Sequence, residues 1–459
     1  MQIRHAVVLL LSLGNLANSQ AIPTDREIKR ILDDRIYVAH QSVGIAVGLI
    51  DKLSARVITS GSAEDAGRPV TGHTEFEIGS VTKIFTSIIL ADMVQKGEVR
   101  LSDPVAQYLP PEVRMPERNG KKITLLDLAT HTSGLPRMPS NFAPKDALNP
   151  YADYTAKSMF QFLSGYQLTR DPGEQYEYSN LGVGLLGFAL ARRAGTDYET
   201  LVFSRVCEPL GMSDTRIKLT SEMKAREATG HDSAMKPTSY WDIPTLAAAG
   251  ALHSTVQDML KLLSAELGFT KTPLAAAMAS MVKDSRPTGA PDARIAIGWQ
   301  LSTRDGQAIF WHNGSTGGFR SYLGFDPAYG IGVVAFSNAN TNTGVDDLGF
   351  HLLDAKQPLA AAPTEHHEVA IDPNLLDGYV GVYTLNPGFS VQITRRGEQL
   401  YTQAPGVPDF ALYAEGAREF FAKEVDLQIR FETDSHGKAN GIVLRYDGTY
   451  ERGSRAPDK

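Results

Sequence analysis

The chain has 459 residues but only one cysteine, Cys207. A single cysteine excludes an intrachain disulfide, so a hydrophobic core must stabilise the fold. Cys207 lies in the apolar stretch LVFSRVCEPLGM, which favours a small core residue over a nucleophile. The sequence also lacks a Cys/His cluster and an H-E-x-x-H motif, so it offers none of the common zinc ligand sets and no metal site is expected.

An excess of positive charge is absent as well. The chain carries 45 Lys and Arg residues against 52 Asp and Glu residues, a formal net charge of -7. A nucleic-acid-binding protein usually has a basic face, so this class is not expected. The hydrophobic share of 42% and the charged share of 21% are ordinary for a soluble globular protein. At roughly 100–200 residues per domain, the length predicts two or three domains.

No long hydrophobic run follows the first residues. The N-terminus has Arg4 and His5, then the short apolar run 6–13 and small residues near 17–21. This pattern predicts a secretory signal peptide over residues 1–21, because the run is too short to span a bilayer. The alternative is a buried N-terminal strand. We therefore expect a periplasmic or secreted protein with no transmembrane segment after removal of the signal.

Several catalytic signatures are missing. There is no G-x-S-x-G, which argues against the nucleophile elbow of an α/β-hydrolase. Neither a Walker-type sequence nor a G-x-G-x-x-G between a strand and a helix occurs. No cofactor is therefore implied.

What is present predicts an α+β domain in which one antiparallel sheet joins both ends of the sequence, with helices between them. Strand-like patterns occur at 42–51, 55–63, 294–302, 307–314, 319–327 and 330–338, and helix-like patterns occur at 27–38, 81–96, 125–131, 181–195 and 255–268.

The composition and the hydrophobic pattern of the sequence change after residue 352. Residues 353–373 are rich in Ala and Pro and predict a linker. Beyond it, short segments alternate apolar and polar residues between Gly-containing turns, which predicts a small antiparallel β domain. The predicted divisions are therefore 1–21, 22–352, 353–373 and 374–455.

The first candidate for chemistry is the Ser-x-x-Lys sequence formed by Ser80 and Lys83. Five Ser-x-x-Lys sequences occur, but only this one leads directly into a long apolar segment with helical spacing. Residues i and i+3 share a helix face, and a desolvated lysine loses basicity and can activate a serine. The alternative is that Ser80 caps the helix and Lys83 is solvated. The other four sequences begin at Ser221, Ser233, Ser280 and Ser435.

Two further elements carry polar groups beside apolar segments. Tyr178-Ser179-Asn180 is the only Tyr-x-Asn in the chain and precedes a predicted helix. Asn180 could also simply cap that helix. His312-Asn313-Gly314 ends an apolar run and leads into a glycine-rich stretch, which would let a substrate backbone lie close. The alternative is an ordinary hairpin turn.

These three elements, in this order, resemble the S-x-x-K, S-D-N and K-T-G set of penicillin-recognising serine hydrolases. The chain is similar to class C β-lactamases, D-alanyl-D-alanine carboxypeptidases and related esterases over residues 25–352. LLDLATHTSGLP (125–136) and GALHSTVQDMLKLL (250–263) support the resemblance. It implies a β-lactamase/transpeptidase-like domain, and the C-terminal part resembles the small β domain that often follows such domains.

The resemblance also implies roles for particular residues. Ser80 would be the nucleophile, Lys83 the general base and Tyr178 the proton donor to the leaving group. His312 would be an electrophilic or orienting group. The substrate would be bound by Asn180, Asn313, Gly314 and Ser315, and the backbone N–H groups of Ser80 and Ser315 would form the oxyanion hole.

One departure leaves the substrate open. The third motif of the family is usually Lys-Thr-Gly, and here His312 replaces the lysine. A histidine with its ordinary pKa near 6.5 would be mostly neutral at pH 7.5. Arg320, six residues after Gly314, is a candidate for a permanent cation that grips a substrate carboxylate, unless it merely faces solvent.

Hydrolysis of the β-lactam ring is the leading hypothesis for a small-molecule or peptide substrate. The alternatives are a D-alanyl-D-alanine carboxypeptidase or endopeptidase, a carboxylesterase, and a non-catalytic penicillin-binding or scaffold protein.

Overall fold

The computed structural model describes residues 22–64, 67–304, 306–361, 366–386, 389–404, 409–423, 425, 427–446 and 449–457. The predicted signal peptide, residues 1–21, lies outside the described residues. Within these ranges, no helix has the length and apolar character needed to cross a membrane.

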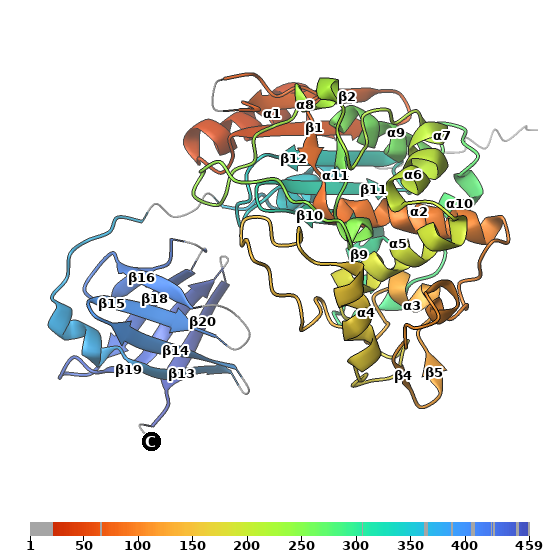
Figure 1. The fold of residues 1–459 in the computed structure, drawn as a ribbon. Helices are drawn as coiled ribbons and strands as arrows, with labels where there is room; N and C mark the ends of the chain where they lie inside the picture. The colour runs from red at the N-terminus through yellow and green to blue at the C-terminus, as the bar shows by residue number, and fades with distance from the viewer. Residues whose placement is uncertain are drawn as a thin grey trace, which may run out of the picture.

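An eight-stranded antiparallel sheet organises the described residues between 22 and 353 (Figure 1). The strand order is β2-β1-β12-β11-β10-β9-β8-β7, so a strand from the start of the chain pairs with one from the end, Ile45 opposite Ser337. This confirms the predicted sheet that joins both ends. The strands are β1 (Gly44–Ile50), β2 (Ala55–Gly61), β7 (Arg286–Pro287), β8 (Ala293–Ile295), β9 (Gln300–Arg304), β10 (Gln307–Ser315), β11 (Arg320–Asp326) and β12 (Ile331–Ser337).

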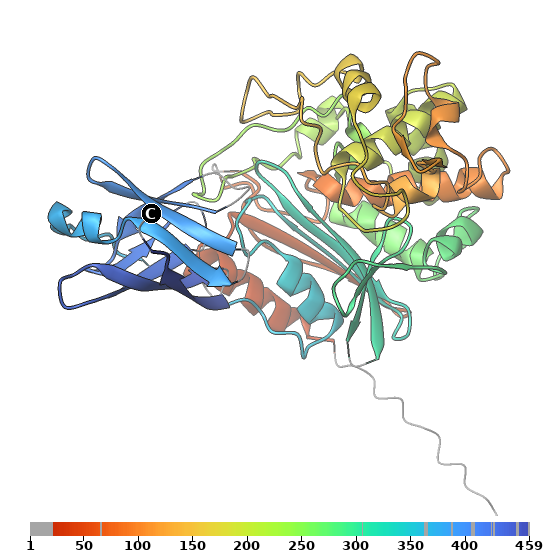
Figure 2. The same ribbon diagram turned by 90° about the horizontal axis from the view of Figure 1, so that it is seen from below.

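Helices cover both faces of this sheet. All seven residues of β1 and all seven of β12 are buried, as expected for central strands packed on two sides. The helices α1 (Asp25–Asp33) and α11 (Asp346–Leu353) lie on one face, and the larger helical part lies on the other (Figure 2). On that second face, α9 (Val256–Glu266) packs directly against the sheet.

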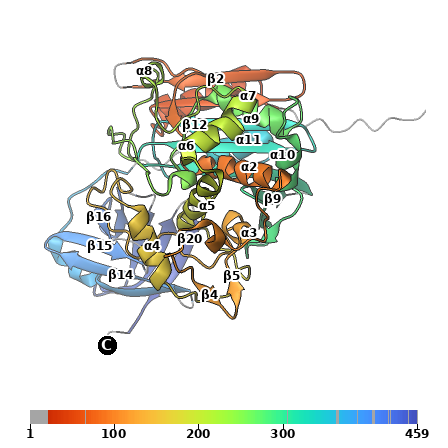
Figure 3. The ribbon, with the colours of Figure 1, turned by 45° about the vertical axis from the view of Figure 1, so that its right-hand side comes forward.

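The helical part is built around α2 (Thr82–Gln95), which packs against its neighbours α5 and α10 (Figure 3). Twelve of the fourteen residues of α2 are buried, so the predicted helix that is apolar nearly all round is confirmed. The remaining α-helices are α3 (Leu125–Ala129), α4 (Ala156–Gly165), α5 (Asn180–Ala194), α6 (Tyr198–Val202), α7 (Glu208–Leu210), α8 (Ser221–Lys224) and α10 (Ala275–Met281).

Short elements complete this part. Two small ribbons pair β3 (Phe76–Glu77) with β6 (His253–Ser254) and β4 (Glu117–Arg118) with β5 (Lys121–Lys122). Single 3₁₀ or π turns are Asp34–Val38, Gly79–Val81, Val105–Tyr108, Phe203–Cys207 and Ala247–Ala249, and a further 3₁₀ turn, Pro373–Gly378, packs against the C-terminal strands. Cys207 is fully buried, in keeping with a core residue.

The C-terminal strands form a closed antiparallel barrel in which β13 pairs with β20. Alternate residues point inward, and Tyr383, Ile429 and Ile442 fill an apolar interior. The predicted small β domain is confirmed. Its closure into a barrel was not predicted from the sequence. The strands are β13 (Gly381–Asn386), β14 (Phe389–Arg396), β15 (Gln399–Gln403), β16 (Phe410–Ala414), β17 (Glu419–Phe421), β18 (Leu427–Thr433), β19 (Ala439–Tyr446) and β20 (Thr449–Arg455).

The segment between the two parts is attached at both of its described ends. Ala360 N–H donates to Asp347 of α11 at 2.6 Å. At the other end, the His366 ring stacks on Phe421 with centroids 4.5 Å apart, and Val369 N–H donates to the barrel strand β16. Most of the predicted linker therefore lies along one part or the other, and residues 362–365 are outside the described ranges.

Candidate active site

Ser80 lies in the 3₁₀ turn Gly79–Val81, where the backbone of α2 begins beside the end of β10. A Cβ at Gly314 would lie 2.1 Å from Ile78 O and 2.9 Å from Ser80 N, so only glycine allows this approach. Gly79 has φ +48°, and a Cβ there would lie 2.8 Å from Ser315 N. Two glycines thus bring the backbone N–H groups of Ser80 and Ser315 to the same place.

Lys83 is buried directly beneath Ser80. Its Nζ lies 2.9 Å from Ser80 Oγ, 3.0 Å from Asn180 Oδ1 and 2.7 Å from the carbonyl oxygen of Ala249. The side chain is 1% exposed, and burial, followed by the charge of Arg137, holds the pKa of Lys83 well below its usual value. A neutral amine has two protons and one lone pair. Asn180 and Ala249 can accept the protons, which leaves the lone pair for the Ser80 hydroxyl.

Neither Ser80 nor Asn180 serves as a helix cap, which was the alternative for each of them. The N-cap of α2 is Val81, without a side-chain hydrogen bond, so Ser80 does not cap the helix. Ser179 caps α5 by accepting from Gly182 N–H at 2.8 Å, which leaves the Asn180 side chain for Lys83. The other Ser-x-x-Lys serines are exposed or bonded within their own helix: Ser221, Ser233 and Ser435 are exposed, and Ser280 donates to Ala277 O at 2.7 Å.

Tyr178 completes the group around Ser80. The Lys83 Nζ lies 4.9 Å from the centroid of its ring, and its hydroxyl is near enough to Ser80 to interact with it. Burial raises the pKa of Tyr178 well above that of a free phenol, so the side chain keeps its proton at neutral pH. The structure therefore brings together Ser80, Lys83, Tyr178 and Asn180, which lie up to a hundred residues apart in sequence.

His312 lies on β10 close to Tyr178, with the two rings 6.2 Å apart. Its Nδ1 lies 2.7 Å from the carbonyl oxygen of Asn313, which can only accept, so Nδ1 carries the proton. Burial, and then the charge of Lys83, lowers the pKa of His312 to about 3. The pKa of His312 is therefore lower than the ordinary histidine value, and the side chain is neutral at pH 7.5, as it would also be with that ordinary value. The cause is burial, since only 1% of the residue is exposed.

Asn313 and Arg320 point to the other face of the sheet. The Asn313 amide donates to Asp346 of α11. Arg320 is opposite Ser315 in the β10–β11 register, its side chain lies against Gly344, and its charge acts on Asp346. The structure does not place these two side chains beside Ser80, because neighbouring strand residues alternate between faces. The cavity at Ser80 is lined by Gly79, Ser80, Tyr151, Asn180, Trp241, Ile243, Ala249, Gly250, Ser315 and Thr316.

The β-lactamase family model matches residues 24–356, and a model described as a domain of unknown function, DUF3471, matches residues 365–455. The chain belongs to the β-lactamase family. Members of this family are serine hydrolases, so the chain is a serine hydrolase with a C-terminal DUF3471 domain.

Relatives in the family are described as peptidases and as β-lactamases. The D-alanyl-D-alanine-carboxypeptidase/endopeptidase AmpH of Escherichia coli K12 is 30% identical over 372 residues, 75% of this chain and 94% of that protein. A β-lactamase of Pseudomonas fluorescens is 28% identical over 359 residues, 68% of this chain and 94% of that protein. A β-lactamase/D-alanine carboxypeptidase structure from Yersinia pestis has a TM-score of 0.62 at 27% identity, covering 72% and 99% of the two chains.

This β-lactamase-family site also contains residues that the motifs did not reveal. Tyr151, Trp241 and Ile243 form walls of the cavity and come from loops without periodicity. Glu77 is buried behind them, where it accepts hydrogen bonds from Thr316 Oγ1 and Trp241 N–H, both at 2.6 Å. Burial raises the pKa of Glu77. Glu77 thus joins two walls of the cavity and lies only three residues before Ser80.

His131 lies behind Tyr178 and belongs to the family-like stretch LLDLATHTSGLP (125–136). Its Nδ1 accepts from Ser179 N–H at 3.1 Å, and its carbonyl oxygen accepts from Glu177 N–H at 2.8 Å. Its ring stacks on Tyr178 with centroids 4.4 Å apart. The backbone of His131 has φ +55°, uncommon for a non-glycine residue. His131 therefore holds the chain on both sides of Tyr178 and the phenol ring between them.

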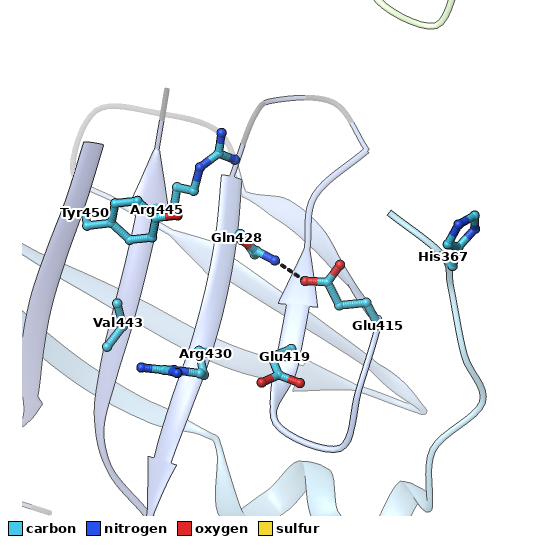
Figure 4. Close-up of a pocket in the computed structure, with 8 residues that line it drawn as sticks. All are labelled: His367, Glu415, Glu419, Gln428, Arg430, Val443, Arg445 and Tyr450. Carbon is cyan, nitrogen blue, oxygen red and sulfur yellow. Dashed lines mark hydrogen bonds between the residues drawn. The ribbon is translucent and has the colours of Figure 1, made fainter. Parts of the chain in front are cut away.

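A second hollow, of about 550 Å³, lies on the outer face of the barrel (Figure 4). It carries charged groups of both signs, and Gln428 donates to Glu415 within it. Its described lining contains no serine, cysteine or lysine, so it offers no nucleophile of the kind found at Ser80. The lining residues are His367, Glu415, Glu419, Gln428, Arg430, Val443, Arg445 and Tyr450.

Proposed function

We propose that the chain hydrolyses β-lactams through an ester formed on Ser80. The observation that carries this proposal is the position of the Lys83 amine, buried, of lowered pKa and 2.9 Å from Ser80 Oγ. A neutral amine can take the proton of the hydroxyl as Ser80 Oγ attacks the carbonyl carbon of the substrate. Asn180 and Ala249 O then receive hydrogen bonds from the resulting ammonium, which stabilises it in a buried place.

The tetrahedral intermediate places negative charge on the former carbonyl oxygen. The N–H groups of Ser80 and Ser315 lie side by side at the cavity and are the proposed donors to this oxygen. Backbone donors are fixed before the reaction, so they need no reorganisation when the charge develops.

The leaving nitrogen needs a proton before it departs. Tyr178 keeps its hydroxyl proton at neutral pH and lies beside Ser80 and Lys83, so it can relay the proton from Lys83 to the nitrogen. In the second half of the reaction the same pair would take a proton from the attacking water. Neutral His312 beside Tyr178 contributes orientation rather than charge.

A peptidase or esterase activity is the second candidate. For the esterase, the favouring observation is that no lysine or arginine occurs among the described residues that line the cavity, since a neutral ester needs no cation there. The relative AmpH is named for carboxypeptidase and endopeptidase activity, which supports a D-amino-acid peptide as an alternative substrate.

The test is kinetic and covalent. The purified protein is incubated with a chromogenic β-lactam, a D-alanyl-D-alanine peptide and an activated ester, and trapped acyl-enzyme is mapped by mass spectrometry. Acylation of Ser80 with turnover is expected. Acylation of another serine, or penicillin trapping at Ser80 without any turnover, would contradict the proposal, and the second result would indicate a binding protein.

The predicted signal peptide supports an exported enzyme, periplasmic or secreted. The N-terminal sequence of the protein recovered from its native cell fraction tests this. A mature chain that begins near residue 22 in the exported fraction is expected, and retention of Met1 in the cytoplasm would contradict it.

A further inference from the structure

A substrate that carries a negative charge beside its scissile bond needs a cation that the three motifs do not supply. His312 occupies the position of the lysine in Lys-Thr-Gly and is neutral. Arg320 lies on the far face of the sheet, against Gly344 and within reach of Asp346. A cation for this task must therefore come from another element.

Arg137 supplies a guanidinium beside Tyr178. Its Cζ lies 5.1 Å from the centroid of the Tyr178 ring. Its positive charge acts on Lys83, on Tyr178 and on Tyr151. A guanidinium does not lose its proton in proteins, so this charge is permanent.

The Arg137 side chain is also available. It is exposed, and across the described ranges its guanidinium makes no hydrogen bond or ion pair with the protein. Other arginines of the domain are occupied in this way: Arg205 contacts Asp92 and Glu98, and Arg286 contacts Asp127. A free fork of N–H donors over a catalytic tyrosine fits a carboxylate, which it can bind with two parallel hydrogen bonds.

The backbone of Arg137 is fixed even though its side chain is free. Its carbonyl oxygen accepts from Asn180 N–H at 3.0 Å and from Leu181 N–H at 3.2 Å. These are donors of the first turn of α5, which carries Asn180 into the site. The backbone of Arg137 is therefore held in a constant relation to the Tyr178-Ser179-Asn180 segment, and only the side chain can move.

We infer that Arg137 binds the anionic group of the substrate on the side of the leaving group. Tyr178 is the group placed to protonate the leaving nitrogen, and Arg137 lies over its ring. β-Lactams and D-alanyl-D-alanine peptides both carry a carboxylate on that side of the scissile amide. This inference rests on the proposed function and assigns a specificity-determining residue to the same site.

The experiment compares matched substrates that differ in one charge. They are a penicillin and its methyl ester, and a D-alanyl-D-alanine peptide and its C-terminal amide. They are measured with the full chain, with Arg137→Met, which keeps much of the stem, and with Arg137→Lys. Arg320→Met is the matched control on the other face of the sheet.

For Arg137→Met we expect kcat/KM to fall about 10- to 100-fold for the carboxylates, the range of a charge-assisted hydrogen bond, and less than about threefold for the neutral partners. Arg137→Lys should recover part of the loss. The preference of the parent for the carboxylates should weaken as salt rises, since an exposed charge is screened. Arg320→Met should leave the preference unchanged.

Equal losses for charged and neutral substrates, or no loss, in Arg137→Met would overturn the inference. A selective loss in Arg320→Met alone would assign the task to Arg320. These outcomes differ from failure of the proposed function, which would appear in the parent as absence of acylation at Ser80 and would overturn both conclusions.

Discussion

The β-lactamase-like domain and the C-terminal barrel differ in whether charged side chains are buried. Around Ser80, groups that are normally charged are buried and neutralised by their surroundings, as Lys83 and His312 are. In the barrel the interior is apolar, and charged side chains such as Arg395 and Arg452 pair with carboxylates on the outside. Burial of a polar group is unfavourable without partners, so it marks the part of the chain where chemistry, rather than stability alone, shaped the structure.

The largest effect should follow from removing the buried amine. Lys83→Met keeps the volume of the side chain but leaves the Ser80 hydroxyl without a base. We expect kcat/KM to fall by about 10³-fold or more, as for other groups that act as a unit with the nucleophile. Ser80→Ala should do the same and abolish labelling by a fluorescent penicillin.

The matched control is Lys224→Met, which alters the exposed Ser221 sequence on α8. It should change nothing measurable in the same assay. Activity that survives Lys83→Met but is lost in Lys224→Met would move the site to Ser221.

His131→Ala is expected to give the next largest loss, because the Tyr178 segment would lose an acceptor and a stacking partner. A misplaced catalytic group can lower the rate by about 100-fold. The loss should appear in kcat more than in KM. It should be greater for amides than for activated esters, which need less help from a proton donor.

Two conservative variants separate the contacts of His131. His131→Asn offers an acceptor near the position of Nδ1 and tolerates positive φ, whereas His131→Phe keeps only the ring. Rescue by Asn would assign the role to the bond with Ser179. Equal losses for amides and activated esters in all variants would show a role in stability alone, which melting temperatures would confirm.

Removal of the barrel should have a small effect. A chain ending after Ala361 keeps α11 and the contact between Ala360 and Asp347, and loses only residues that do not line the Ser80 cavity. Turnover of a small ester should stay within about threefold of the full chain, the scatter expected for changes that touch no site residue. The measurement is kcat/KM together with the melting temperature. An inactive but folded truncation would show that the barrel contributes to the site.

The smallest expected change is in the pH dependence of substrate preference. With a pKa of about 3, His312 is neutral at every pH normally used for assay, and Arg137 is always charged. The ratio of kcat/KM for a penicillin to that for its methyl ester should therefore be constant between about pH 5.5 and 8.5, where a histidine with its ordinary pKa would titrate.

The rates themselves should fall at low pH. The Lys83 amine must be neutral to accept the serine proton, and the unprotonated form is lost as pH drops through its lowered pKa. A preference that rises with acidity would instead indicate that His312 becomes charged in the complex.

Short-range relations in the sequence predicted the centre of the site. Ser80 and Lys83 are one helical turn apart, so helix geometry alone places their side chains on one face. Asn180 follows Ser179, the N-cap of α5, by one residue, so its position at the start of that helix is also set locally. The antiparallel sheet and the C-terminal β domain were likewise predicted from strand patterns that alternate or recur at both ends of the chain, whereas the β-lactamase-like fold was implied by the resemblance.

The remaining features depend on distant parts of the chain. The face to which Asn313 and Arg320 point is set by the packing of β10 and β11 between two layers. The neutral state of His312 depends on burial under elements far away in sequence. Tyr151, Trp241 and Arg137 come from loops that have no periodicity, and barrel closure joins the first and last strands of the C-terminal domain.

The close approach of Gly79 and Gly314 divides the site into a part that can vary and a part that cannot. A methyl group at Gly314 would meet Ile78 O at 2.1 Å, so every single-residue replacement there displaces the peptide groups that face the substrate. The walls have no such restriction, because Trp241, Ile243 and Tyr151 contribute side chains rather than backbone. Proteins that descend from this enzyme would thus change their substrates through substitutions in the loops. A laboratory library aimed at new substrates should randomise Tyr151, Trp241 and Ile243 and leave the two glycines unchanged.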